Sequence, residues 1–327
     1  MIIANGKIQK KAYCSHCFSI IHWDDPKDET TKNGHRMIHC PICGHDEDID
    51  DDAIITETSY EDNPTTYING VAYTSVEAGD ILRIQEDLTI ESAKLNSIIL
   101  DLDGNTLTLS KETLIPEGNC MIMNGKIIGA GDFDCIGTKA GSYLTLSNVT
   151  IESKKNGITA KGGMLSVDNC IITAQKAGIL GGSVSRIFIN GSDITSKDDG
   201  SIVTDSAETA GNNIIVINGA TLNGNRETEN YLPVAVYIAN NDIVKFNKGT
   251  INVSNGSGIV VRGGSVTVND EDVVFNITGD DSMTGYIEDT KNKIPAGKKI
   301  VVDKKANYPR ANTISVDANE KDIYVIE

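Results

Sequence analysis

The sequence predicts an all-β protein, a parallel β-helix that follows a small N-terminal cysteine module. Three observations point to this. A short phrase recurs along most of the chain, apolar and polar residues alternate around each copy, and two Cys-x-x-Cys pairs lie within the first 45 residues. A sequence repeat of 20 to 30 residues is typical of solenoids, and alternation with period two indicates strands.

The repeated phrase is an apolar residue, one variable position, then Asn, Gly, Asp or Lys, and a second apolar residue further on. Its copies are 20, 24, 21, 22, 28, 29 and 22 residues apart. They begin at Leu102, Ile122, Leu146, Val167, Ile189, Ile217, Phe246 and Val268. Because the spacing is regular and no stretch carries a convincing amphipathic helical pattern, each copy is expected to be one coil of a solenoid.

Strands are expected around each phrase, as in residues 143–147 and 186–190, with one face buried. The Asn or Gly between the two apolar residues marks a turn, because both residues tolerate positive φ. A second set of apolar positions recurs in antiphase, so each coil should hold at least two strands separated by a bend. Its members are Ile158, Ile179, Ile202, Val236 and Ile259.

Eight or nine coils would form a rod on the order of 40 Å long. The spacings of 28 and 29 residues predict loops that leave the coil around residues 207–213 and 225–233. Asn148, Asn169 and their equivalents are expected to stack and bond along the turn. Two buried ladders follow from the register. The first is Leu146, Val167, Ile189 and Ile217, and the second is Ile151, Ile172, Ile194 and Leu222.

This pattern resembles the right-handed, pectin-lyase-like β-helix family over roughly residues 76–276. The likeness rests on the repeat rather than on a signature motif, and it implies the hand: a right-handed, single-stranded parallel β-helix at residues 76–278. Leucine-rich repeats have a similar period, but their L-x-x-L-x-L-x-x-N register is absent.

Composition narrows the function classes. The 327 residues carry a formal net charge of −17, which disfavours nucleic-acid binding, since phosphate contacts need clustered Lys and Arg. We expect no signal peptide and no membrane span. Three of the seven cysteines, Cys120, Cys135 and Cys170, are scattered through the solenoid and are interpreted as buried small residues.

The other four cysteines predict a structural zinc site. Cys14 and Cys17 are followed after 22 residues by Cys40 and Cys43, and two such pairs form a tetrahedral ligand set. Iron is the alternative metal, and disulfides or free thiols are the alternative to any metal. The segment, residues 12–45, resembles a zinc ribbon or rubredoxin-type knuckle, with Gly44 closing the turn. The histidines of this segment are expected beside the site or in solvent: His16, His22, His35, His39 and His45.

Four segments follow in order: a zinc-ribbon module at residues 1–46, an acidic linker and first strands at 47–75, the β-helix at 76–278, and capping strands at 279–327. The run of acids at residues 46–52 is interpreted as a solvated linker, although a calcium site is the alternative. Caps are expected because the open edges of a solenoid aggregate.

A catalytic site is not predicted. Asp198 and Asp199 resemble the Asp-Asp step of polygalacturonase-type hydrolases, but that family also needs a Gly-His-Gly and an Arg-x-Lys, and every His precedes residue 50. Other acid pairs fall in turns, where Asp is common. Adjacent residues on a strand face opposite ways, so Asp198 and Asp199 could share a site only in a bend.

The expected function is therefore structural. A β-helix joined to a cytoplasm-folded zinc module is similar to phage tail spikes, head fibres and capsid decoration proteins, which implies a homotrimer in the virion that contacts capsid or tail proteins and host-surface glycan. This step is an analogy of fold. The alternatives are a glycan-cleaving hydrolase or lyase, and a cytoplasmic scaffold or binding protein.

Overall fold

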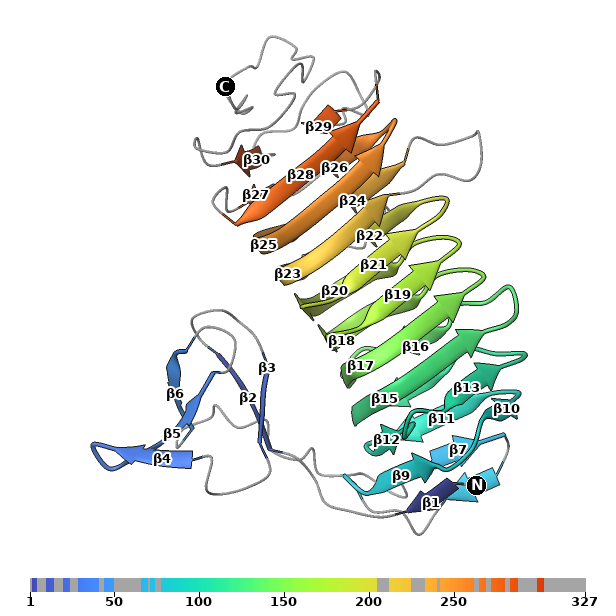
Figure 1. The fold of residues 1–327 in the computed structure, drawn as a ribbon. Coiled ribbons are helices and arrows are strands. Elements are labelled where there is room, and N and C mark those ends of the chain that lie inside the picture. Colours follow the sequence, from blue (N-terminus) through green and yellow to red (C-terminus); the bar gives the residue numbers. More distant parts are fainter. Residues whose placement is uncertain are drawn as a thin grey trace.

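The computed structural model describes residues 2–4, 10–14, 20–23, 29–40, 44–49, 66–69, 71–73, 78–204, 212–224, 233–239, 242–261, 265–268, 272–279, 283–287 and 299–302. These residues form strands and turns without a helix. The main body is a stack of parallel coils, with a small N-terminal module beside it (Figure 1). In the described part of the chain, no helix is long and apolar enough to cross a membrane.

Each coil contributes one strand to each of three faces. Face A stacks β9 (Ile81–Ile84), β12 (Ile99–Asp101), the first halves of β15 (Asn119–Gly129) and β17 (Tyr143–Ser153), the second halves of β18 (Ile158–Asp168) and β20 (Ile179–Asn190), the first halves of β23 (Ile214–Gly224) and β25 (Ile243–Ser254), then β27 (Ser265–Val268) and β30 (Lys299–Val302).

Face B stacks β10 (Leu88–Ile90), β13 (Thr106–Leu109), the second halves of β15 and β17, β19 (Ile171–Ala174), β21 (Asp193–Ser196), the second halves of β23 and β25, and β28 (Val273–Thr278). Face C stacks β11 (Ala93–Asn96), β14 (Ile115–Glu117), β16 (Ile136–Thr138), the first halves of β18 and β20, β22 (Gly200–Thr204), β24 (Val234–Ile238), β26 (Ser257–Val261) and β29 (Met283–Ile287).

About seven turns of the solenoid are regular. They run from β12 to β26, and a less regular strand set extends the stack at each end. The solenoid is therefore shorter than the eight or nine coils that were expected from the sequence. At the N-terminal end the stack differs because β9 and β11 (Ala93–Asn96) pair with antiparallel strands.

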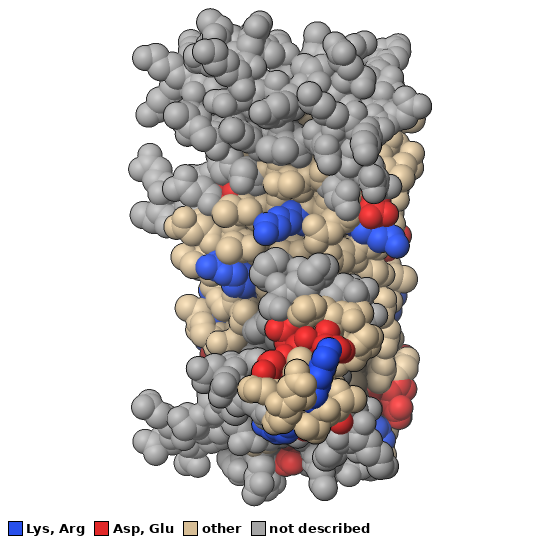
Figure 2. Space-filling model, turned by 90° about the vertical axis from the view of Figure 1, so that its left-hand side faces the viewer, with Lys and Arg blue, Asp and Glu red and all other residues tan. Residues whose placement is uncertain are grey.

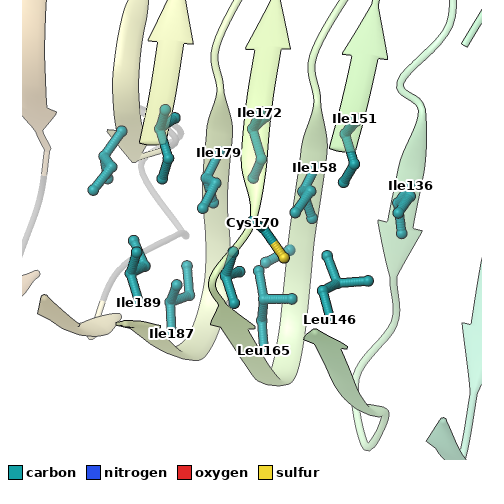
Figure 3. Packing of buried hydrophobic residues seen from close by; sticks show 14 of the residues in the cluster. Ile136, Leu146, Ile151, Ile158, Leu165, Cys170, Ile172, Ile179, Ile187 and Ile189 are labelled. Carbon is teal, nitrogen blue, oxygen red and sulfur yellow. The ribbon is translucent and has the colours of Figure 1, made fainter. Parts of the chain in front are cut away.

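The interior is filled by the two predicted ladders. Leu146 pairs with Val167, Val167 with Ile189 and Ile189 with Ile217, and all four are buried. The second ladder, from Ile151 to Leu222, is in register in the same way. A third ladder on face C joins Ile158, Ile179, Ile202, Val236 and Ile259. Figure 3 shows these side chains converging on the rod axis.

In five of the phrases the bend is a single left-handed residue. Asn124, Asn148 and Asn169 have φ values of 59°, 55° and 52°, and Gly191 and Gly219 take the same place in later coils. The chain crosses from face A to face B at this point. The predicted turn is thus confirmed, because Asn and Gly occupy the left-handed region at the least steric cost.

The Gly-Ile pairs of the second register have a steric cause. A Cβ on Gly157 would lie 2.6 Å from the carbonyl oxygen of Gly178, and one on Gly178 would lie 2.7 Å from that of Ser201. Glycine therefore lets successive coils approach closely where face B turns into face C.

Three domain boundaries differ from expectation. β1 (Ile2–Ala4) pairs antiparallel with β9, so the first residues belong to the solenoid and not to the cysteine module. β6 (Asp46–Asp48) pairs with β5 (His35–His39), which makes these acids a strand and not a linker. β29 and β30 continue faces C and A beyond residue 278. All three boundaries depend on strand pairing with other segments of the chain. Local composition gives no indication of such pairing.

The N-terminal module contains a two-stranded sheet of β2 (Lys10–Tyr13) and β3 (Ile20–Trp23) and a three-stranded sheet of β4 (Glu29–Lys32), β5 and β6. β7 (Thr66–Ile68) and β8 (Val71–Tyr73) form a hairpin, and β7 lies antiparallel to β11 in the first coil. Of the segments predicted as loops, residues 207–213 and 225–233, all but residues 212, 213 and 233 lie outside the described residues.

Candidate functional site

Asp198 and Asp199 lie in the bend that joins β21 to β22, where face B turns into face C. The objection that adjacent residues face opposite ways does not apply there, since the two are not on a strand. The structure thus brings both carboxyl groups to one corner of the rod, as the sequence required for any shared site.

Asp198 is held by the preceding coil. Gln175 Nε2 donates a hydrogen bond of 2.7 Å to its Oδ2, and Lys176 Nζ lies 3.9 Å from the same oxygen. Only 7% of the Asp198 side chain is exposed, and its Oδ1 is buried with no hydrogen-bond partner among the described residues. The sequence analysis did not predict a role for Gln175 or Lys176. Only their separation of about one coil from Asp198 could have indicated that they lie beside it.

Asp199 is exposed, and its backbone N–H donates to Ser196 Oγ at 3.0 Å. Partial desolvation raises the pKa of its carboxyl group above the usual value. Lys176 opposes this shift and the charge of Asp198 adds to it. A carboxyl group of raised pKa next to a second carboxyl group is a pairing that general acid catalysis can use. However, Asp198 accepts a hydrogen bond from Gln175, which is the arrangement expected of a structural residue.

Other candidate acids and bases have structural partners. Asp134 accepts hydrogen bonds from Asn156 Nδ2 at 3.0 Å and Thr159 Oγ1 at 2.7 Å. Arg186 Nη1 donates to the carbonyl oxygen of Asn212 at 2.9 Å. Arg226, Glu227, Glu229, Arg262, Asp280 and Asp281 lie outside the described residues.

Amide ladders line the corner between faces A and B, one position before the predicted one. Asn247 Nδ2 donates to Asn218 Oδ1 at 2.8 Å, Asn218 donates to Asn190 at 3.2 Å, and Asn190 donates to Asp168 Oδ1. Asn148 and Asn169 occupy the left-handed turn instead. That conformation is why the bonded stack forms at the neighbouring position, where the backbone is extended.

A second ladder runs on face B. Asn276 donates to Asn252, and Asn252 to Asn223, each at 2.8 Å. Asn223 Nδ2 donates to Asp193 Oδ1 at 2.7 Å. Both ladders therefore point toward the N-terminal end and finish on a carboxylate. An amide chain in which every member donates in one direction needs an acceptor at that end, and an aspartate supplies it.

Cys14 and Cys40 of the predicted metal site are brought together. Both are wholly buried in one small apolar cluster with Ile21, Ile38 and Ile49. The turn after Cys40 has the expected form: Gly44 has a φ of 76°, and its N–H donates to the carbonyl oxygen of Cys40 at 2.9 Å. Cys17 and Cys43 lie outside the described residues. In the part of the chain that is described, no group of three or more His, Cys, Asp or Glu is arranged to hold a metal.

Three of the histidines, His35, His39 and His45, are exposed on the three-stranded sheet. His35 pairs with Asp48 at 2.9 Å and His39 with Asp46 at 3.0 Å, and the side chains of both histidines are more than half exposed. His45 lies 3.7 Å from Glu47. An open depression of about 520 Å³ on this sheet is lined by Lys32, Asn33, His35, Met37, Gly44, His45, Asp46 and Asp48. His16 lies outside the described residues.

The solenoid cysteines are confirmed as buried small residues. Cys120, Cys135 and Cys170 are each no more than 1% exposed. Burial raises the pKa of the Cys135 and Cys170 thiols to about 12, so neither is a reactive thiolate.

Comparison with known families agrees with this geometry. The family model described as "Right handed beta helix region" matches residues 134–314. The chain is a member of the right-handed β-helix family. No curated protein and no solved structure matches the chain.

The right-handed β-helix match begins after the cysteine module and covers the corner that carries Asp198 and Asp199. It fixes the hand of the coil, which the sequence analysis took from resemblance. The family includes enzymes and non-enzymes, so membership accounts for the rod and leaves the activity to the residues on it.

Proposed function

We propose that this right-handed β-helix protein is a structural or attachment protein of a virus particle, in which the cysteine module anchors a rigid rod. The observation that carries the proposal is the rod itself. Its interior is filled by ladders of aliphatic side chains, and ladders of hydrogen-bonded amide side chains join its coils. The step from rod to particle rests on analogy of fold with phage tail spikes, head fibres and capsid decoration proteins.

Rigidity supports this role. Each regular coil is hydrogen-bonded to the next on all three faces, and the interior side chains of all coils form one continuous buried cluster. The net charge of −17 favours solubility at the high local concentration of a particle surface. Capsid or tail proteins are the proposed partners of the module, and host-surface glycan is the proposed partner of the rod.

The test is whether the protein belongs to particles. Particles purified from the source of the sequence should contain the chain at a fixed ratio to the major capsid protein, and antibodies against the rod should label one defined structure on them in electron micrographs. Recovery of the chain only in the soluble fraction, with none on purified particles, would refute the proposal.

We also propose that Cys14, Cys17, Cys40 and Cys43 bind one zinc ion. The shared burial of Cys14 and Cys40 and the left-handed Gly44 support this, because a small module with few apolar residues needs a metal or disulfides to stay folded. Metal analysis of protein purified without added metal should find about one zinc per chain.

A matched pair of variants sharpens the zinc test. Cys40→Ser removes a proposed ligand and should abolish zinc binding. Cys170→Ser alters a buried thiol of the rod and should leave the zinc content unchanged. Equal zinc content in the two variants, or native Cys14–Cys17 disulfides, would refute the site.

A glycan-cleaving enzyme is the second candidate, and one observation favours it. The buried Oδ1 of Asp198 lacks a protein partner among the described residues, and Asp199 beside it has a raised pKa. Acidic and neutral polysaccharides should be screened with the wild type and with the Asp198→Asn/Asp199→Asn double variant. Asp134→Asn serves as the control. Cleavage lost only in the double variant would replace the structural proposal.

A further inference from the structure

Asn-Gly pairs recur along this chain, and such pairs are the sequences most prone to spontaneous deamidation. The backbone nitrogen of the glycine attacks the side-chain carbonyl carbon of the asparagine, and glycine has no Cβ to obstruct the approach. The sequence contains nine of these pairs, with their asparagines at Asn5, Asn33, Asn69, Asn124, Asn156, Asn190, Asn218, Asn223 and Asn255. The attack needs rotation of the backbone between the two residues, so the fold decides which pairs can react.

Four pairs of the rod are held by hydrogen bonds to their asparagine side chains. In each of them the side-chain amide donates to the preceding coil and accepts from the following one, as in the ladders described above: Asn156, Asn190, Asn218 and Asn223. The N–H groups of Gly157 and Gly191 also donate to a carbonyl oxygen of the next coil. Rotation at these pairs would break bonds to both neighbouring coils.

Two further pairs of the rod are restrained in other ways. Asn124 Nδ2 donates to Asp101 Oδ1 at 3.3 Å, and the glycine that follows Asn124 is paired within β15. Asn255 is exposed, but Gly256 is buried, and a Cβ there would lie 2.1 Å from the carbonyl oxygen of Pro233. The peptide between these two residues therefore has little room to turn. In two other pairs the glycine lies outside the described residues.

The remaining pair, Asn33 and Gly34, forms the two-residue turn between β4 and β5. Lys32 pairs with His35 across this turn, and the φ values of Asn33 and Gly34 are 54° and 88°, as in a type I′ hairpin. Both turn residues are exposed, and a Cβ on Gly34 would have no heavy atom within 4 Å. No described residue forms a hydrogen bond with the Asn33 side chain. In Figure 1 the turn projects away from the rod, so its rotation disturbs no neighbouring segment.

We propose that Asn33 is a site of spontaneous deamidation in the folded protein. The Gly34 nitrogen gives its proton to a base in the solvent and forms a bond to Asn33 Cγ, and the Cγ–Nδ2 bond breaks with release of ammonia. Water then opens the succinimide ring. Opening on one side leaves aspartate at position 33, and opening on the other side leaves isoaspartate. The net change is the uptake of one water and the loss of one ammonia.

The modification changes the surface of the module. Asn33 lines the open depression on the small sheet together with Asp46 and Asp48, so a carboxylate at position 33 adds a further negative charge there. Figure 2 looks at the rod from the side of the module and shows acidic and basic side chains in front of its lower half. Isoaspartate also lengthens the backbone of the turn, which a two-residue type I′ hairpin does not accommodate. The inference goes beyond the proposed function, because it needs neither a particle nor a metal.

Peptide mapping of the wild-type protein tests the proposal, because the rod pairs are internal controls. The full chain is incubated in mildly alkaline buffer, digested at acidic pH and analysed by mass spectrometry for conversion of amide to acid. Conversion at Asn33 should be at least about tenfold faster than at Asn190 or Asn218, since those two must first break a buried amide hydrogen bond. In protein unfolded with urea, the three sites should convert at similar rates.

Two results would overturn the inference. Conversion at Asn190 or Asn218 that is as fast as at Asn33 in the folded protein would show that the fold does not select the site. An unchanged Asn33 in the folded protein, with conversion in urea, would show that the turn is held. The variant Asn33→Asp supplies the reference peptide that separates the aspartate product from isoaspartate by chromatography. The zinc and particle experiments do not depend on any of these outcomes.

Discussion

At the scale of single residues, the interior positions tolerate the least change. Ile189 is wholly buried between Val167 and Ile217, in the middle of a ladder that runs through the regular coils. Its neighbours along this line are buried aliphatic side chains, which offer no partner to a polar group.

The change Ile189→Asp should therefore prevent folding, because it buries an unpaired charge in an apolar interior. The control Ile189→Val should cost about 1 kcal/mol in the free energy of unfolding. Circular dichroism and thermal melting of the soluble fraction measure both. A soluble Ile189→Asp variant with a cooperative melt would show that the register is wrong.

Asp168 gives a pH prediction. Burial raises the pKa of its carboxyl group above the usual value, although Asn190 and Ser166 donate hydrogen bonds to it and oppose the shift. A carboxyl group with a raised pKa in the folded state holds its proton more tightly when folded. Its stabilising contribution is therefore present below the unfolded pKa, and it is lost as pH rises through the folded pKa.

The change Asp168→Asn should remove this loss, since an amide keeps an acceptor for Asn190 and does not ionise. The melting temperature of the variant should fall less than that of the wild type as pH rises from about 4 through the raised pKa toward neutrality. Asp193→Asn, at the end of the other ladder, is the matched control. Parallel pH profiles for wild type and Asp168→Asn would contradict the assignment.

At the scale of elements, the coils are joined by amide ladders as well as by backbone pairing. In the ladder from Asn247 to Asp168 the two interior members, Asn218 and Asn190, each donate one hydrogen bond and accept another. Loss of one buried member leaves a donor on one side and an acceptor on the other without a partner, so the effect exceeds that of one lost hydrogen bond.

The change Asn190→Ala should accordingly cost about 1–3 kcal/mol in the free energy of unfolding. Asn190 is 4% exposed, whereas Asn276 lies exposed at the end of its ladder. The control Asn276→Ala should cost less than about 0.5 kcal/mol. Chemical denaturation measures both, and equal costs would mean that the ladder does not act as a unit.

At the scale of the whole molecule, the outer surfaces of the three faces differ. Face B exposes Thr and Asn residues, and face A carries an outward row that is almost wholly buried from Ile99 to Val216. Face C carries an outward row in register across six coils, and Val203 and Val260 in it are almost wholly buried. Its described members are Gly137, Thr159, Leu180, Val203, Tyr237 and Val260.

We predict that the protein is a homotrimer. A thin rod gains avidity by repetition, and the half-buried Leu180 and Tyr237 of face C are suited to a contact between copies. Light scattering should give a mass of about three times the 35.0 kDa of one chain. The change Leu180→Asp should lower that mass, whereas Ile171→Asp on face B should not. A monomer at high concentration would contradict the prediction.

The sequence by itself determined the solenoid, the register of its two phrase ladders, the left-handed turn within each phrase and the burial of the solenoid cysteines. These features are periodic. Alternation of every second residue shows which side chains of a strand point inward, and the coil repeat shows which positions lie above one another. It also marked Asp198 and Asp199 as an unusual pair, although it did not show what holds them.

Only the tertiary structure decided the rest. It showed that β1 pairs with β9 and that β29 and β30 extend the solenoid. It also showed that Gln175 donates a hydrogen bond to Asp198. It also decided that an outward row on face A is buried. Each of these joins residues that are one coil or many tens of positions apart. Many residue types can make such contacts once the fold has brought the two positions together, so the contacts produce no periodic pattern in the sequence.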